Sequence, residues 1–166
     1  TAIPGDVIAS IGDAHQNVPE GFTVHRKLQR VLDSRYKMSR EGGIDWAFGE
    51  LLALGSLLME GTPVRMSGQD SRRGTFAQRH ALLHDRVTDR NWMPLQNLGD
   101  DQARFSVYDS LLSEYAVMGF EYGYSVERPD SLVLWEGQFG DFANGAQTVI
   151  DEFIAAGEQK WEQRSS

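Results

Sequence analysis

Along the chain, helical stripes of hydrophobic positions alternate with short segments typical of strands. The strongest stripe lies at 44–59, where Ala, Phe and Leu recur at helical spacing and predict a largely buried helix. Further stripes predict a helix after residue 108 and another at 141–157. Three short segments predict strands, at 64–67, 105–108 and 131–135. This alternation is typical of an α/β fold with a mostly parallel, doubly wound sheet.

The same pattern predicts which surfaces are covered. The last strand, at 131–135, is nearly all apolar, which predicts helices on both of its faces. The helix after residue 108 is expected to pack its apolar side chains against the sheet, and these are Tyr115, Val117, Met118, Phe120 and Tyr122.

The first forty residues differ from the rest. Residues 1–24 combine Pro, Gly and polar side chains without a sustained period, and predict an extended connector. From 25 to 40 a helical stripe is flanked by Arg and Lys on the other faces, which predicts a basic linker helix. Such a helix is typically solvated or lies between domains, and an anion-binding face is the alternative. One α/β domain is expected at 41–166.

Length and composition exclude several classes of function. With 166 residues the chain suffices for one domain. Its formal charge of −8 argues against binding nucleic acid or an anionic membrane. Without Cys, neither disulfides, thiolate nucleophiles nor Cys-based metal sites can form. Apolar runs far below the roughly 20 residues of a membrane span predict a soluble, cytoplasmic protein. Since the chain starts without Met and stops directly after a helical pattern, we expect it to be part of a larger protein.

The polar loop at 68–74 follows the first predicted strand, where open α/β sheets bind ligands. Gln69 and Asp70 are therefore candidates, although ordinary turn chemistry explains this loop equally well. His80 and His84 are four residues apart and would share one face of a helix, as metal-binding pairs do. Because the Glu of the zinc-protease motif and a nearby third His are missing, we predict no metal site and a polar role near a pocket for His80.

An acid and two aromatics follow the other predicted strands. Glu114 stands in the first turn of a helix, and Phe139 and Phe142 come after the last strand. A buried carboxylate beside aromatic faces can hold a flat heterocycle and share a proton with its nitrogen. The alternative is that Glu114 only interacts with the helix dipole. Another acid, Glu50, is expected on the polar edge of the helix at 44–59. Phosphate-binding glycine loops and the Gly-x-Ser-x-Gly elbow are absent.

Several long, ungapped segments resemble the thiamine-diphosphate-dependent component of 2-oxoglutarate dehydrogenase, also called 2-oxoglutarate decarboxylase. These segments are Ser67–Phe76, Arg79–Ala81, Leu112–Ala116, Gly119–Tyr124, Leu134–Gln147 and Ala156–Trp161. The resemblance covers about residues 22–166. It implies the pyrimidine-binding domain of a transketolase-like enzyme, truncated at its C-terminal end, with thiamine diphosphate as the cofactor.

The resemblance also implies a role for each candidate residue. Glu114 matches the glutamate that hydrogen-bonds a ring nitrogen of the aminopyrimidine and promotes its imino form. Phe139 matches the aromatic that stacks on the pyrimidine, and Phe142 lines the same pocket. Gln69 matches a residue near the substrate, and His80 a polar residue near the active-site entrance.

The family's Gly-Asp-Gly…Asn motif for magnesium and diphosphate is missing, so the resemblance places Mg²⁺ in another domain. The implied partners are the remaining domains, a second subunit of a homodimer that completes the active site, a lipoyl-bearing acyltransferase and a small 2-oxo acid. The implied activity is decarboxylation of 2-oxoglutarate with transfer of the succinyl unit to a lipoyl carrier, and the fragment alone is expected to be inactive. A related thiamine enzyme, such as another 2-oxo acid dehydrogenase or a transketolase, and a non-catalytic ligand-binding or assembly module are the alternatives.

Overall fold

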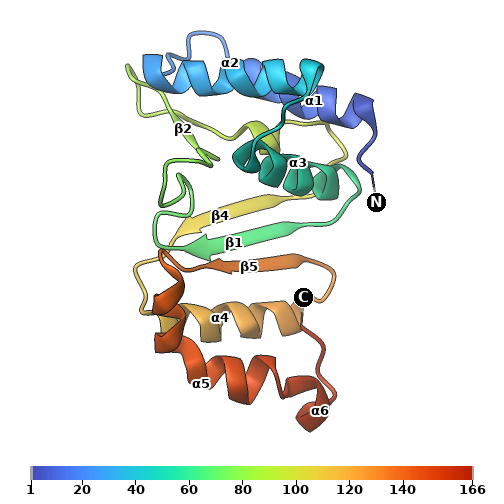
Figure 1. The fold of residues 1–166 in the computed structure, drawn as a ribbon, viewed down its shortest axis with the longest axis vertical. Helices are drawn as coiled ribbons and strands as arrows, with labels where there is room; N and C mark the ends of the chain where they lie inside the picture. The colour runs from blue at the N-terminus through green and yellow to red at the C-terminus, as the bar shows by residue number, and fades with distance from the viewer. Residues whose placement is uncertain (1, 166) are drawn as a thin grey trace.

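A parallel sheet forms the middle layer of the molecule. The computed structural model describes residues 2–165. Strands β1 (Val64–Gly68), β4 (Phe105–Asp109) and β5 (Leu132–Glu136) pair in the order β4-β1-β5, and both pairings are parallel. The helices of 5–59 lie on one side of the sheet and those of 114–161 on the other (Figure 1). The predicted α/β fold with a parallel sheet is confirmed.

The register of the sheet brings the carboxyl ends of the three strands to one level. At the end of β1, Gly68 stands opposite both Asp109 of β4 and Glu136 of β5. The segments that leave the three strands therefore start from the same edge of the sheet, which is where open α/β sheets bind ligands.

The predicted buried helix is α3 (Trp46–Met59), and it forms the core on one face of the sheet. Asp45 caps it by accepting a hydrogen bond of 2.8 Å from the Phe48 backbone N–H, which satisfies a free donor of the first turn. Phe48, Leu51 and Leu58 are fully buried and pack with β1 and β4 in one apolar cluster.

The prediction of an extended connector at 1–24 is wrong for its first part, because Gly5–Gln16 form a helix, α1. Pro4 directly precedes this helix, a position where proline costs no hydrogen bond. Val7, Ile8 and Ile11 follow at helical spacing and pack on the core cluster, with Ile11 fully buried. Burial of this short stripe outweighs the Pro and Gly around it.

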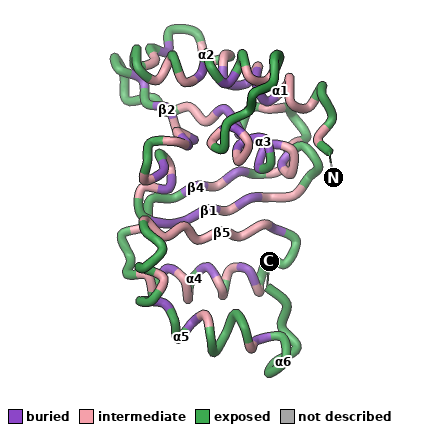
Figure 2. Tube along the Cα trace, in the orientation of Figure 1, coloured by how far each residue is buried: buried purple, intermediate pink, exposed green. Residues whose placement is uncertain are grey.

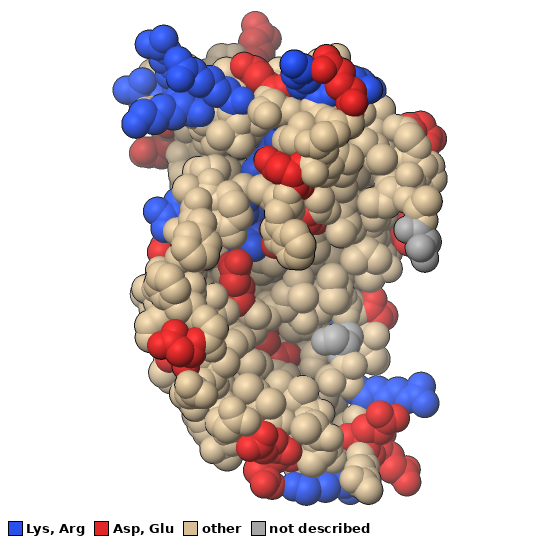
Figure 3. Space-filling model, in the orientation of Figure 1, with Lys and Arg blue, Asp and Glu red and all other residues tan. Residues whose placement is uncertain are grey.

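A helix is found where the basic linker helix was predicted, and it is α2 (Arg26–Glu41), which packs against α1. Arg26, Lys27 and Arg30 are exposed near its start, and Lys and Arg gather over this end of α2 in Figure 3. Arg35 departs from this pattern because it is buried, with 1% of its surface exposed.

Among the described residues, no helix combines the length and hydrophobicity needed to cross a membrane.

The segment between β1 and β4 is irregular. It contains a small hairpin of β2 (Leu83–His84) and β3 (Asn91–Trp92) and a 3-10 turn, η1 (Pro94–Gln96). The helix that would have paired His80 with His84 does not form. Ala77 and His80 have left-handed backbone angles, φ 54° and 45°, and these interrupt any helix.

β5 and the helices beyond it differ from the prediction. In α4 (Glu114–Glu127), Tyr115 and Phe120 are 54% and 57% exposed, and the helix instead turns Val117 and Glu121 inward. Glu121 does so because it forms two hydrogen bonds, of 2.6 and 2.9 Å, with Arg65 of β1. The side chains of β5 are only partly buried, since this strand lies at an edge of the sheet.

The continuous helix predicted at 141–157 is broken into short pieces. These are η2 (Gly140–Ala146), α5 (Gln147–Val149), the π-helical turn η3 (Ile150–Ile154) and α6 (Gly157–Trp161). Gly140 and Gly145 weaken the start of a regular helix. Most of this segment is exposed in Figure 2, and Phe153 and Ile154 of the predicted buried stripe are 38% and 42% exposed.

Candidate functional site

Three segments that leave the sheet at its carboxyl edge are joined to one another. The Ser110 backbone N–H, just after β4, donates to the Gly68 carbonyl at 2.9 Å, and the Arg72 backbone N–H donates to the Asp109 carboxylate at 2.9 Å. Gln138, just after β5, donates its side-chain N–H to Asp70 Oδ2 at 3.1 Å. The loop after β1 thus contacts the segments that carry Glu114 and the two aromatics.

Glu114 is the first residue of α4, directly after the cap residue Ser113, whose hydroxyl accepts from the Ala116 N–H. The backbone of η2 lies against its side chain, since a Cβ placed on Gly145 would lie 3.7 Å from Glu114 Oε2. The residue is half-buried. Among the described residues, no hydrogen bond or ion pair occupies its carboxylate. The carboxylate is therefore available as an acceptor, beside a segment that also carries Phe142.

The aromatic pair forms an exposed cluster at the same edge. The ring centroids of Phe139 and Phe142 are 6.2 Å apart, and Phe139 is 51% and Phe142 42% exposed. Phe76, from the loop after β1, meets Phe139 edge to face at 6.0 Å and is 75% exposed. Sequence reasoning missed Phe76 as a site residue, although an aromatic in a polar loop at a ligand-binding edge is itself a signal. Clustered exposed rings are typical of a surface that binds a partner or ligand.

The loop after β1 carries two further candidates, Gln69 and His80, at separate positions. Gln69 is exposed at the carboxyl edge, next to Asp70, which is held by Gln138 and by an ion pair of 3.2 Å with Arg73. His80 is half-buried farther along the loop, and its backbone N–H donates to the Arg73 carbonyl at 3.0 Å. No contact in the described part of the chain joins His80 to Glu114 or to the aromatic cluster.

The surroundings of His80 favour its neutral form. Burial lowers the pKa of His80, and the positive charge of Arg35 lowers it further. His84 lies exposed in β2 and does not share a face with His80. Within residues 2–165, no three His, Asp or Glu side chains are grouped so that they could hold a metal ion.

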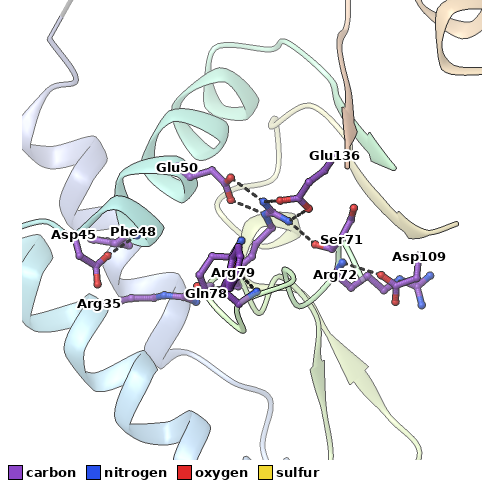
Figure 4. A network of polar contacts seen from close by, with 11 residues as sticks. Arg35, Asp45, Phe48, Glu50, Ser71, Arg72, Gln78, Arg79, Asp109 and Glu136 are labelled. Carbon is purple, nitrogen blue, oxygen red and sulfur yellow. Dashed lines mark hydrogen bonds and ion pairs between the residues drawn. The ribbon is translucent and has the colours of Figure 1, made fainter. Parts of the chain in front are cut away.

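A buried arginine on the loop after β1 is the centre of a network of polar contacts (Figure 4). The Arg79 guanidinium, 1% exposed, donates to both carboxylate oxygens of Glu50 at 2.5 and 2.8 Å and to both of Glu136 at 2.7 Å. It also donates to the Ser71 carbonyl at 2.7 Å. Burial by itself lowers the pKa of Arg79, but the hydrogen bonds to Glu136 and Glu50 outweigh it and raise the pKa above its ordinary value. Sequence reasoning placed Glu50 on a polar edge and missed Arg79 and Glu136.

The helix α2 reaches the same place. Arg35 donates to the carbonyl oxygens of Gln78 and Arg79 at 2.9 and 2.6 Å. Figure 4 shows its side chain extending from α2 toward the loop that carries Arg79. A residue of the predicted linker helix thus fixes the backbone of the loop after β1.

Comparison with known proteins identifies the family. The model of the transketolase pyrimidine-binding domain matches residues 42–166. The chain belongs to this family. Its match covers the whole sheet, the loop after β1 and the start of α4, so the edge that carries Glu114, Phe139 and Phe142 is part of the pyrimidine-binding domain.

Curated relatives agree with this assignment. The chain is 58% identical to the "Multifunctional 2-oxoglutarate metabolism enzyme" of Mycobacterium sp. strain JLS, over 99% of its own length and 14% of the relative. It is 54% identical to the protein of the same name from Mycolicibacterium vanbaalenii, with the same coverage. The chain therefore spans about one seventh of these relatives, which contain further domains. The predicted resemblance to the thiamine-dependent 2-oxoglutarate enzymes is confirmed.

Proposed function

We propose that this pyrimidine-binding domain holds the aminopyrimidine ring of thiamine diphosphate within an enzyme that decarboxylates 2-oxoglutarate and passes the succinyl unit to a lipoyl carrier. The observation that carries the proposal is the unpaired, half-buried carboxylate of Glu114 at the carboxyl edge of the sheet, beside the segment η2 that follows Phe139 and carries Phe142. The names of the relatives support 2-oxoglutarate as the substrate.

The residues at this edge fit an aminopyrimidine. Such a ring is flat and carries nitrogens that take part in hydrogen bonds, so it requires an aromatic face and an acceptor at its rim. Phe139 provides the face, Phe142 closes the pocket beside it, and Glu114 accepts the hydrogen bond. When bound, thiamine diphosphate supplies the carbon nucleophile and the electron sink that 2-oxo acid decarboxylation requires.

With the cofactor bound, the carboxylate of Glu114 would hold a proton at the ring nitrogen and so favour the imino form of the amino group. Phe139 and Phe142 are half-exposed in this chain, so they would exclude water from this hydrogen bond once the ring and the rest of the site cover them. The lower local dielectric would then strengthen the hydrogen bond. Gln69 and His80 lie on the loop after β1, on the substrate side of the pocket. His80 serves as a neutral polar group there, because its lowered pKa keeps it unprotonated at neutral pH.

The rest of the site comes from outside these residues. We propose that another domain binds Mg²⁺ and the diphosphate, that a second subunit of a homodimer completes the pocket, and that a lipoyl-bearing acyltransferase takes the succinyl unit. The length of the relatives beyond this chain is consistent with such domains.

The test is Glu114→Gln and Glu114→Ala in the full-length enzyme, with thiamine-diphosphate-dependent release of carbon dioxide from 2-oxoglutarate as the assay. We expect a loss of roughly 10²- to 10⁴-fold, the usual contribution of a positioned proton-transfer group. Glu127→Gln, at the exposed opposite end of the same helix, is the matched control and should retain full activity. Wild-type turnover in Glu114→Ala would refute the proposal.

A profile of 2-oxo acids and of transketolase donors on the same enzyme separates 2-oxoglutarate from the substrates of related thiamine enzymes. We expect turnover with 2-oxoglutarate to exceed that with each of the others. A transketolase reaction without release of carbon dioxide would move the assignment to that branch of the family.

A further inference from the structure

The loop after β1 holds the turn after β5 at three points. Asp70 accepts a hydrogen bond of 3.1 Å from Gln138, Phe76 meets Phe139 edge to face at 6.0 Å, and Arg79 binds Glu136 through two hydrogen bonds of 2.7 Å. Each contact joins a residue of 70–79 to a residue of 136–139. The position of the Phe139 ring is therefore set from the side of this loop.

Of the three contacts, the one through Arg79 is the most constrained. Asp70 is partly exposed and Phe76 is 75% exposed, whereas Arg79 is 1% exposed. A planar guanidinium that binds two carboxylates with two hydrogen bonds each has little freedom to rotate or shift. Glu136, in turn, is the last residue of β5 and stands three residues before Phe139.

The far side of Arg79 is fixed as well. Glu50 comes from α3, whose apolar face is packed in the core, and it binds the guanidinium at 2.5 and 2.8 Å. Arg35 of α2 holds the backbone carbonyl of Arg79 itself at 2.6 Å. Arg79 is therefore anchored to α3 through its guanidinium and to α2 through its backbone carbonyl, and it links both helices to the end of β5.

We propose that Arg79 is a positioning residue for cofactor binding: by holding Glu136 it sets the turn that presents Phe139 to the pyrimidine ring. The inference rests on the proposed function. It assigns a role to a residue that does not itself contact the ring, and it distinguishes the two carboxylates that Arg79 binds. Glu136 ends β5 and is followed three residues later by Phe139, whereas Glu50 lies on α3.

The two carboxylates form a matched pair for the test. The side chains of Glu50 and Glu136 are 28% and 25% exposed, and each forms two hydrogen bonds with the same guanidinium. Glu50→Gln and Glu136→Gln therefore remove one negative charge each from comparable surroundings. In the full-length enzyme both should lower the melting temperature by similar amounts, because each leaves the buried arginine with one carboxylate.

Cofactor affinity separates the pair. Well below the melting temperatures and at saturating Mg²⁺, we expect Glu136→Gln to raise the Kd for thiamine diphosphate at least tenfold, while Glu50→Gln changes it by less than about threefold, where 1.4 kcal/mol corresponds to tenfold. At limiting thiamine diphosphate the turnover of Glu136→Gln should be lower than that of the wild type. At saturating cofactor most of this difference should disappear, because Glu114 is intact. Arg79→Lys keeps the charge but loses the paired geometry, and should raise the Kd as Glu136→Gln does.

Equal Kd values for Glu50→Gln and Glu136→Gln, whether changed or unchanged, would overturn the positioning role and leave Arg79 as a purely structural residue. That result is distinguishable from failure of the proposed function. If Glu114→Ala is inactive while the pair is equal, only the role of Arg79 fails. If Glu114→Ala is fully active, the proposed function fails first.

Discussion

The closest backbone approach at the carboxyl edge provides a sharp test of the fold. A Cβ added to Gly68 would lie 2.2 Å from the Glu136 carbonyl oxygen and 3.1 Å from its carbonyl carbon. The neighbouring Ser71 hydroxyl, 2.7 Å from the same Cβ, can rotate away. The carbonyl has no such freedom, because Gly68 and Glu136 are partners in the register of β1 and β5. Gly68→Ala therefore requires the two strand ends to separate.

The cost follows from the size of that separation. Carbon and oxygen atoms that are not bonded approach to about 3.3 Å. The strand ends must then move apart by about 1 Å. Overpacking of this kind costs about 1–3 kcal/mol, and a clash between two backbones belongs at the upper end, near about 3 kcal/mol. For a domain of this size, about 2–4 °C per kcal/mol gives a fall in Tm of about 6–12 °C.

Thermal unfolding followed by circular dichroism measures this effect. Gly123→Ala is the matched control, because Gly123 lies inside α4 and a Cβ there meets nothing within 4 Å. It should raise stability by about 0.5–1 kcal/mol, the usual gain when Ala replaces Gly within a helix. If Gly68→Ala melts within about 2 °C of the wild type, the close packing of β1 against β5 is refuted.

Two further predictions concern the side of the sheet that α1 and α3 cover. Leu51→Ala, at a fully buried position of the core cluster, should lower the free energy of unfolding by about 2–5 kcal/mol in urea titrations, whereas a loss under about 1 kcal/mol would contradict the packing of α3. Burial and the charge of Arg35 lower the pKa of His15 to about 4 from the 6.5 of an unperturbed histidine. Between pH 6.5 and 4, His15 is therefore protonated in the unfolded chain but mostly neutral in the folded chain. The free energy of unfolding should fall by about 3 kcal/mol as the pH drops from 6.5 to 4. Urea titrations at both pH values should show a smaller fall in His15→Leu, and an unchanged fall would exclude His15 as its source.

The sequence predicts the parts of the fold whose burial repeats with a simple period. The helix α3 and the three strands can be predicted from the sequence because their apolar side chains face one core formed within the chain. The same reasoning fails for Tyr115 and Phe120, which are apolar and yet exposed. A hydrophobic pattern shows that a surface avoids water, but it does not show whether this chain or another surface covers it. The helix α1 was missed for the opposite reason, since Pro and Gly masked a stripe of only three or four positions.

Only part of the candidate site could likewise be predicted from the sequence. The carboxyl-edge rule pointed to Gln69 and Asp70, and an acid at a helix start with two aromatics after the next strand pointed to Glu114, Phe139 and Phe142. Arg79 and its carboxylates could not be found by such reasoning. Arg79 is 29 residues from Glu50 and 57 from Glu136, and only the folded chain brings the three together. Local pattern identifies which groups can act, whereas the tertiary fold decides which groups hold them in place.

The buried arginine of α2 bears on how this domain can be exchanged between enzymes. The family match begins at residue 42, yet Arg35 lies seven residues earlier and binds the carbonyl oxygens of Gln78 and Arg79 inside the matched region. A chimera joined at residue 42 would leave both oxygens without this donor, and a foreign helix at this place would rarely carry an arginine in register. The unit that can be recombined intact is therefore larger than the unit defined by sequence similarity, and a successful graft should begin ahead of α2.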